Sequence, residues 1–124
     1  MRVTIVGCSG SFPGPDSPAS CYLVEHDGHR VLLDLGNGAF GPLQRYADVY
    51  DVDGVVLSHL HADHCLDLTA YYVARKYHPD GAKPSIPVLG PTGTADRMAR
   101  AYDLPHTPGM HGEFVFTDHV PVTE

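Results

Sequence analysis

Six short apolar runs, each bounded by glycine, proline, serine or aspartate, dominate the pattern of hydrophobic and polar positions along this chain. Runs of this length that are rich in β-branched and aliphatic residues predict strands. The six predicted strands are Arg2–Val6, Cys21–Glu25, Arg30–Leu35, Gly54–Ser58, Ile86–Leu89 and Glu113–Thr117. Asp27-Gly28 joins the second run to the third, and this dipeptide predicts a tight hairpin there.

Longer segments between these runs have the features of helices. The three predicted helices are Gly38–Tyr46 with Pro42 in its first turn, Asp67–Tyr77, and a segment that ends at Tyr102 with Thr92 or Thr94 as its N-cap. The stretch Ser9–Ser20 holds three prolines and two glycines, so we expect it to be irregular. Alternation of strand, loop and helix predicts a layered α/β architecture with helices against a sheet.

The stretch that follows the fourth predicted strand carries the strongest chemical signal. It reads Ser58-His59-Leu60-His61-Ala62-Asp63-His64, with three imidazoles and one carboxylate in six consecutive residues. His59 and His61 share one side of an extended backbone, and irregular backbone at a strand end can bring the next two side chains to the same point. Imidazole together with carboxylate favours zinc or a related divalent ion over calcium. A solvated histidine-rich loop is the alternative interpretation, because the chain has nine histidines.

The remaining histidines, and the cysteine beside the motif, are weaker candidates for a metal site. His26 and His29 fall in the predicted hairpin, where we expect them to be exposed and to have no metal role. Three later histidines lack the strand-end setting of the motif: His106, His111 and His119. Cys65 adjoins the motif, but we expect it to be a small buried packing residue.

The charge balance bears on which partners the protein can have. The formal net charge is -7, with eight basic and fifteen acidic residues. A protein that binds an extended phosphate backbone usually presents a basic patch. The two basic clusters, Arg75-Lys76 and the spaced pair Arg97 and Arg100, are expected to be solvated helix faces. Nucleic-acid binding is therefore not favoured.

Hydropathy and cysteine usage bear on the compartment. No stretch is long and apolar enough to span a membrane, and the apolar run Val3–Val6 is too short for a secretory signal. Three widely spread cysteines suit reduced thiols better than a disulfide framework. We therefore expect a cytoplasmic protein without membrane association.

The motif and its surroundings resemble a known family. H-x-H-x-D-H is the hallmark of the metallo-β-lactamase-fold hydrolases, and both Met1–Ser11 and Val31–Gly36 are similar to segments of the ribonuclease Z-like branch. Within that branch, three segments look most like bacterial, actinobacterial-type phosphodiesterases that hydrolyse cyclic nucleotides: Gly7–Ser11, Pro15–Ser20 and Leu60–Asp67. The resemblance implies an αββα sandwich of two similar halves. We expect residues 1–124 to be its N-terminal half, with an apolar patch on the sheet face that would meet the other half.

The resemblance also implies a set of site residues. His59 and His61 would hold one zinc ion, Asp63 and His64 a second, and ligands from the other half would complete both sites. Manganese or another divalent ion is an alternative metal. Asp63 would orient or deprotonate the attacking water. Asp34 and Ser58 are candidates to hold a ligand imidazole in place, and strand-end turn residues are the alternative interpretation of both.

The function implied by the resemblance is hydrolysis of a small phosphodiester, with a 3′,5′-cyclic nucleotide as the best single substrate. A tRNA 3′-processing endonuclease of the ribonuclease Z type is the alternative enzyme, and the same fold also hydrolyses thioesters, lactones and β-lactams. A different class is a non-catalytic metal-binding half-domain. In that case a second copy could complete the zinc site across a homodimer.

Overall fold

One six-stranded sheet forms the framework of residues 1–119. The computed structural model describes residues 1–119 of the 124-residue chain. The strands are β1 (Arg2–Gly7), β2 (Cys21–His26), β3 (His29–Leu33), β4 (Gly54–Val56), β5 (Ile86–Gly90) and β6 (Phe114–Asp118), and they lie in the sheet in that order. β1, β2 and β3 pair antiparallel, whereas β3, β4, β5 and β6 pair parallel. The predicted layered α/β architecture is confirmed.

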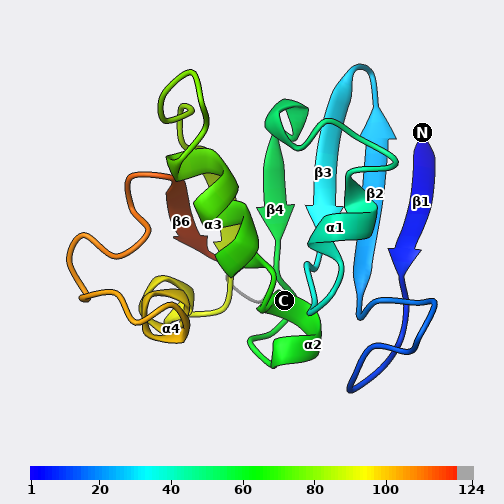
Figure 1. Ribbon diagram of the computed structural model, residues 1–124, viewed down its shortest axis with the longest axis horizontal. Coiled ribbons are helices and arrows are strands. Elements are labelled where there is room, and N and C mark those ends of the chain that lie inside the picture. Colours follow the sequence, from blue (N-terminus) through cyan, green and yellow to red (C-terminus); the bar gives the residue numbers. More distant parts are fainter. Residues whose placement is uncertain (120–124) are drawn as a thin grey trace, which may run out of the picture.

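Short helices make the crossovers between the parallel strands. They are α1 (Phe40–Leu43), a 3₁₀ turn at Val49–Asp51, α2 (Ala62–Cys65), α3 (Leu68–Lys76) and α4 (Thr94–Ala101). Figure 1 shows α1 and α3 in front of the sheet, and α2 at the end to which β4 points. None of the helices in residues 1–119 has the length and apolar character needed to cross a membrane.

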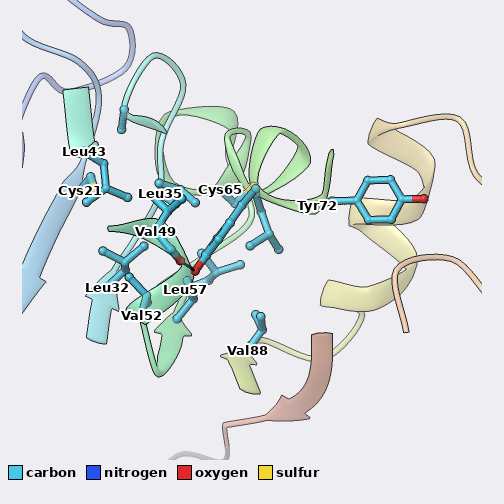
Figure 2. Packing of buried hydrophobic residues seen from close by; sticks show 14 of the residues in the cluster. Cys21, Leu32, Leu35, Leu43, Val49, Val52, Leu57, Cys65, Tyr72 and Val88 are labelled. Atoms are coloured by element: carbon cyan, nitrogen blue, oxygen red, sulfur yellow. Dashed lines mark hydrogen bonds between the residues drawn. The ribbon is translucent and has the colours of Figure 1, made fainter. Parts of the chain in front are cut away.

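The core lies between one face of the sheet and these helices. Leu32, Val55 and Val88 project from neighbouring strands and are fully or almost fully buried, as is Tyr71 of α3. Complete burial of one such aliphatic side chain contributes roughly 1.5–3 kcal/mol. Figure 2 shows most of the labelled side chains gathered in this layer, with Tyr72 pointing away from them toward α4. Tyr71 and Tyr72 are both buried and therefore serve packing.

The opposite face of the sheet carries exposed apolar side chains. Val3 and Ile5 of β1 are 56% and 60% exposed, and Leu33 of β3 and Val115 of β6 are also exposed. Ile5 pairs with Tyr22 and Tyr22 with Leu33, so these residues form one row across the sheet. The apolar patch that the sequence predicts on one sheet face is therefore present.

Several predicted element boundaries are wrong for local reasons. β3 ends at Leu33 because Asp34 adopts a left-handed φ of 62°, which ends the extended backbone. The predicted helix Gly38–Tyr46 is a single turn. α4 has Gly93 as its N-cap, with φ of 90°, and the Thr94 hydroxyl instead donates to the Pro91 carbonyl at 2.6 Å.

Arg75 is the clearest correction to the sequence-based picture. Arg75-Lys76 was expected to be a solvated helix face, yet Arg75 is only 2% exposed while Lys76 is exposed. The Arg75 guanidinium carbon lies 5.6 Å from the centroid of the Tyr71 ring, on the side of α3 that faces the core. Arg97 and Arg100 are exposed, as predicted.

Candidate metal centre

The histidine motif lies where β4 leaves the sheet. The Leu57 amide still donates to the Leu89 carbonyl of β5 at 2.8 Å, and the chain then departs from the sheet at Ser58. His61 has extended backbone and is the N-cap of α2, whose single turn contains Asp63 and His64. This turn folds the chain back, so that the His59 and His64 rings lie with their centroids 3.8 Å apart. The sequence predicted only a bend at this point.

Three of the four candidate metal ligands converge. His59, Asp63 and His64 each offer a ligand atom, and these atoms lie within 4.8 Å of one another. His64 Nε2 and Asp63 Oδ2 are 3.1 Å apart. The His61 ring centroid is 5.0 Å from that of His59, but His61 is exposed and lies outside the group of three.

The Asp34 carboxylate fixes the orientation of the motif. The residue is only 8% exposed, and its carboxylate accepts hydrogen bonds from the Ser58 amide at 2.7 Å and from the Ser58 hydroxyl at 2.8 Å. His64 Nδ1 lies 2.7 Å from Asp34 Oδ2, so a proton on Nδ1 leaves the lone pair of Nε2 facing Asp63. His59 Nδ1 lies 3.0 Å from the Ser58 hydroxyl oxygen, which can accept a hydrogen bond from a protonated Nδ1 in the same way.

Backbone hydrogen bonds hold the α2 turn against the segment that follows β3. The Leu35 amide donates to the His64 carbonyl at 2.8 Å, and the Asp67 amide donates to the Leu35 carbonyl at 3.1 Å. Gly36 lies so close that a Cβ there would fall 2.1 Å from the Asp63 carbonyl oxygen. The site is thus built on contacts between two crossover segments, and only glycine allows them to approach this closely.

The loop between β1 and β2 reaches the site through one amide. Ser11, which has a left-handed φ of 68°, donates its backbone N–H to Asp63 Oδ2 at 3.1 Å. Desolvation opposes ionisation of Asp63, but this amide and the neighbouring His64 hold the pKa of the carboxyl below its usual value. Sequence reasoning did not single out Ser11, although the glycine- and serine-rich composition of its loop is typical of segments that bind through backbone amides.

The weaker candidates for metal ligands lie outside the group of three converging residues. Six histidines lie outside the motif, and none of them belongs to the group of three. Five of the six are exposed: His26, His29, His106, His111 and His119. Cys65 is buried in the core, as predicted, and burial raises the pKa of its thiol to about 11. Cys65 belongs to the core cluster and lies outside the group of three converging residues, which supports a packing role.

The three converging residues fit a divalent metal ion. Two imidazoles and one carboxylate are ligands that zinc commonly takes in proteins. Two ligand atoms bound tetrahedrally to zinc at about 2.1 Å lie about 3.4 Å apart, which is close to the 3.1 Å between His64 Nε2 and Asp63 Oδ2. The oriented ligand imidazole is a further feature of metal sites.

Comparison with known families agrees with this geometry. The family model of the metallo-beta-lactamase superfamily matches residues 14–123, which include the motif and its support. The chain belongs to the metallo-beta-lactamase superfamily. The resemblance drawn from the motif and the two flanking segments is therefore confirmed at the level of the family.

Individual members of the superfamily align over most of the chain. An uncharacterized protein of Mycobacterium tuberculosis is 49% identical over 103 residues, which are 82% of this chain and 37% of that protein. The probable metallo-hydrolase YhfI of Bacillus subtilis is 30% identical over 89% of this chain and 46% of its own length. The crystal structure of YhfI superposes with a TM-score of 0.77 at 23% identity, covering 96% of this chain and 46% of that one.

A ribonuclease Z-type protein is also among the structural neighbours. The crystal structure of the short form of human tRNase Z superposes with a TM-score of 0.74 at 27% identity, covering 96% of this chain and 45% of that one. The chain spans less than half the length of each of these superfamily members. The ribonuclease Z-like branch expected from the sequence is in agreement with these neighbours.

Proposed function

We propose that the protein is a metal-dependent hydrolase, and specifically a dinuclear zinc phosphodiesterase that cleaves a small phosphodiester such as a 3′,5′-cyclic nucleotide. The observation that carries the proposal is the convergence of His59, Asp63 and His64 at the end of β4, with Asp34 orienting His64. YhfI, a relative of 30% identity, is named a probable metallo-hydrolase, which supports the same reaction class.

The residues divide into ligands and supports. His59 and His61 would hold one ion, and Asp63 and His64 the second, with manganese as an alternative metal. This pairing requires the His61 ring to turn toward His59, because His61 lies outside the group of three converging residues. Bound divalent ions lower the pKa of water toward neutrality and stabilise the charge that develops on phosphoryl oxygens. Asp34 and Ser58 would keep the ligand imidazoles in one tautomer.

Asp63 would also orient or deprotonate the attacking water. Its lowered pKa keeps the carboxylate ionised at neutral pH, so that it can accept a hydrogen bond from water. The Ser11 amide on Oδ2 restrains the rotation of the side chain. Asp63 is therefore the residue to which we assign the catalytic role.

The charge of the chain favours a small substrate. A net charge of -7 opposes binding of an extended phosphate backbone, whereas a single phosphodiester can be neutralised locally by bound cations. The alternative is tRNA 3′ processing, which the structural similarity to human tRNase Z favours.

The three free cysteines suit a reducing compartment, so we assign the activity to the cytoplasm. We also propose that the active form is a homodimer.

The test is an assay of the protein expressed from its complete coding sequence. We expect hydrolysis of a 3′,5′-cyclic nucleotide that is lost on chelation and restored by zinc or manganese, and native mass spectrometry should find two metal ions per polypeptide. His64→Ala should reduce turnover by about two orders of magnitude or more, while the exposed hairpin variant His26→Ala should not change it.

Other outcomes would redirect the assignment. Cleavage of a tRNA precursor without cleavage of cyclic nucleotides would favour the ribonuclease Z-type alternative. Tight metal binding without hydrolysis of any phosphodiester would indicate a non-catalytic metal-binding module. Activity that persists after complete removal of metal would refute the proposed chemistry.

A further inference from the structure

The loop between β1 and β2 carries an exposed aromatic ring close to the metal centre. Phe12 is 72% exposed, whereas the other three phenylalanines of the chain are buried or half-buried: Phe40, Phe114 and Phe116. Phe12 directly follows Ser11, whose amide donates to Asp63 Oδ2 at 3.1 Å. In Figure 1 this loop lies at the same end of the sheet as α2. A fully apolar ring is therefore left in solvent one residue away from a contact with a candidate metal ligand.

The backbone that leads into Phe12 is strained. Ser11 has a left-handed φ of 68°, and the Phe12 amide donates to the Gly10 carbonyl at 2.8 Å. A hydrogen bond that spans a single residue of positive φ closes a γ-turn of the rare, strained kind. Backbone strain of this kind persists where the surrounding structure enforces it, and it is concentrated at active sites and ligand-binding segments. The turn brings the Ser11 amide to Asp63 and leaves the Phe12 ring uncovered by the rest of residues 1–119.

Contacts within the loop hold this arrangement in place. The Gly14 amide and the Ser9 hydroxyl both donate to the Ser17 carbonyl, at 2.8 and 3.0 Å. Pro13 follows Phe12, and a proline restricts the backbone of the residue before it to extended conformations. Because the segment is already ordered, little conformational entropy is lost when a ligand packs against the ring.

The charge of the chain favours an uncharged contact with the substrate. The net charge of -7 does not attract an anion, so bound metal ions would have to hold the phosphate group. A nucleotide also presents a planar base, which stacks on aromatic side chains whatever its sequence identity. Phenylalanine has no hydrogen-bonding group in its side chain, so its ring face is what Phe12 offers to a ligand.

We infer that Phe12 stacks on the base of a nucleotide whose phosphodiester is bound at the metal centre, and that it thereby selects nucleotides over phosphodiesters without an aromatic group. This inference rests on the proposed phosphodiesterase function and names the residue that recognises the substrate's base. Stacking tolerates different bases. Purine nucleotides should have a lower KM than pyrimidine nucleotides, because the larger base buries more apolar surface.

The first test compares two substrates with the same reacting bond. They are 3′,5′-cyclic adenosine monophosphate and its base-free analogue, the 3′,5′-cyclic phosphate of 1-deoxyribose, assayed with the zinc-loaded protein expressed from its complete coding sequence. Phe12→Ala should raise the KM for the nucleotide by about 10-fold or more, with kcat nearly unchanged, because the stacking contact is the same in the ground state and the transition state. The KM for the base-free analogue should not change. Phe12→Trp should keep a low KM for the nucleotide.

Tyr77→Ala is the matched control. Tyr77 is an aromatic residue of similar exposure, 66%, and it follows α3 at the end away from α2. Its replacement should leave the KM for both substrates unchanged.

The second test reads binding without turnover. Residues 1–124 contain no tryptophan, so the difference in fluorescence between Phe12→Trp and the native protein reports on position 12. Adenosine monophosphate should quench this fluorescence in a saturable way, because its base stacks on the indole. Ribose 5-phosphate, which carries the phosphate without the base, should leave it unchanged.

Three results would overturn the inference. The first is an equal KM for the nucleotide in Phe12→Ala and the native protein. The second is an equal rise in KM for both substrates, which would show that Phe12 only supports the loop. The third is the absence of quenching by adenosine monophosphate, as would occur if another part of the protein covers Phe12. Quenching without hydrolysis of either substrate would instead refute the proposed function and still support the stacking contact.

Discussion

Replacement of Asp34 by asparagine tests the support of the metal centre with almost no change in side-chain size. In the native site, Oδ1 accepts the Ser58 amide at 2.7 Å, while Oδ2 faces His64 Nδ1 at 2.7 Å and the Ser58 hydroxyl at 2.8 Å. Asparagine can keep its one oxygen on the Ser58 amide, but its NH₂ group then meets His64 Nδ1. The imidazole must accept there and carry its proton on Nε2, the nitrogen that faces Asp63 at 3.1 Å.

This change of tautomer removes the lone pair that a metal ion needs. Loss of such a supporting hydrogen bond costs about 10- to 100-fold in metal affinity, which corresponds to about 1.4–2.7 kcal/mol. Competition for zinc against a chromophoric chelator measures the affinity, and the nitrogen chemical shifts of His64 report its tautomer directly. We expect weaker zinc binding together with a proton on Nε2 in Asp34→Asn.

Asp67→Asn is the matched control. Asp67 is also partly buried, and its Oδ2 accepts the Phe40 amide at 2.8 Å without touching a histidine of the motif. Both variants should lose some stability in the absence of metal, but only Asp34→Asn should lose zinc affinity. Native zinc affinity and a native His64 tautomer in Asp34→Asn would show that Asp34 is only a turn carboxylate, and the reasoning would be refuted.

The packing of the fold leads to three further predictions. Burial raises the pKa values of Cys21 and Tyr71 to about 12 from 9.0 and 10.0, so the unfolded chain loses these protons first as the pH rises. Urea titrations should therefore show that the free energy of unfolding falls above pH 9, by up to about 1.4 kcal/mol per pH unit for each group. At neutral pH the two groups should make no contribution to this pH dependence. Gly36→Ala should lower the free energy of unfolding by about 1–3 kcal/mol, because the new Cβ would lie 2.1 Å from the Asp63 carbonyl oxygen. Gly41→Ala is the control, since a Cβ at Gly41 would have no heavy atom within 4 Å, and its thermal unfolding should show almost no loss of stability. Ile5→Ser should reduce hydrophobic-dye binding and self-association of the purified 1–124 polypeptide, since Ile5 lies on the exposed apolar face, and unchanged dye binding would contradict this account.

The elements that the sequence predicted well are those that local chemistry determines. The hairpin between β2 and β3 is the clearest, because Asp27 and Gly28 both adopt left-handed backbone, as the dipeptide predicts. The position of the motif at a strand end was predicted because an apolar run stops at Ser58. Neither prediction depends on which segments are neighbours in space.

The features that sequence reasoning missed depend on contacts between distant segments. The four-residue α2 is too short for hydrophobic periodicity to reveal it, and it is held by amides of the segment after β3. Arg75 was placed in solvent because arginine is rarely buried, and only the packing of α3 against the sheet determines which face it occupies. Ser11 contacts Asp63 across 52 residues of sequence, so no local pattern could reveal that hydrogen bond.

The register of two parallel strands links the fold to the site. β3 and β4 pair with Leu33 opposite Val56, so the residue after β3, Asp34, lies beside the start of the motif, and its amide donates to the Val56 carbonyl at 2.8 Å. A slip of one residue would turn the Asp34 side chain to the other face and leave both Ser58 and His64 without their acceptor. The carboxylate that orients the ligand imidazole is therefore supplied by strand pairing. The sequence alone left Asp34 and Ser58 open between a supporting role and plain turn residues, and the parallel pairing of β3 and β4 gives the contacts that favour the supporting role.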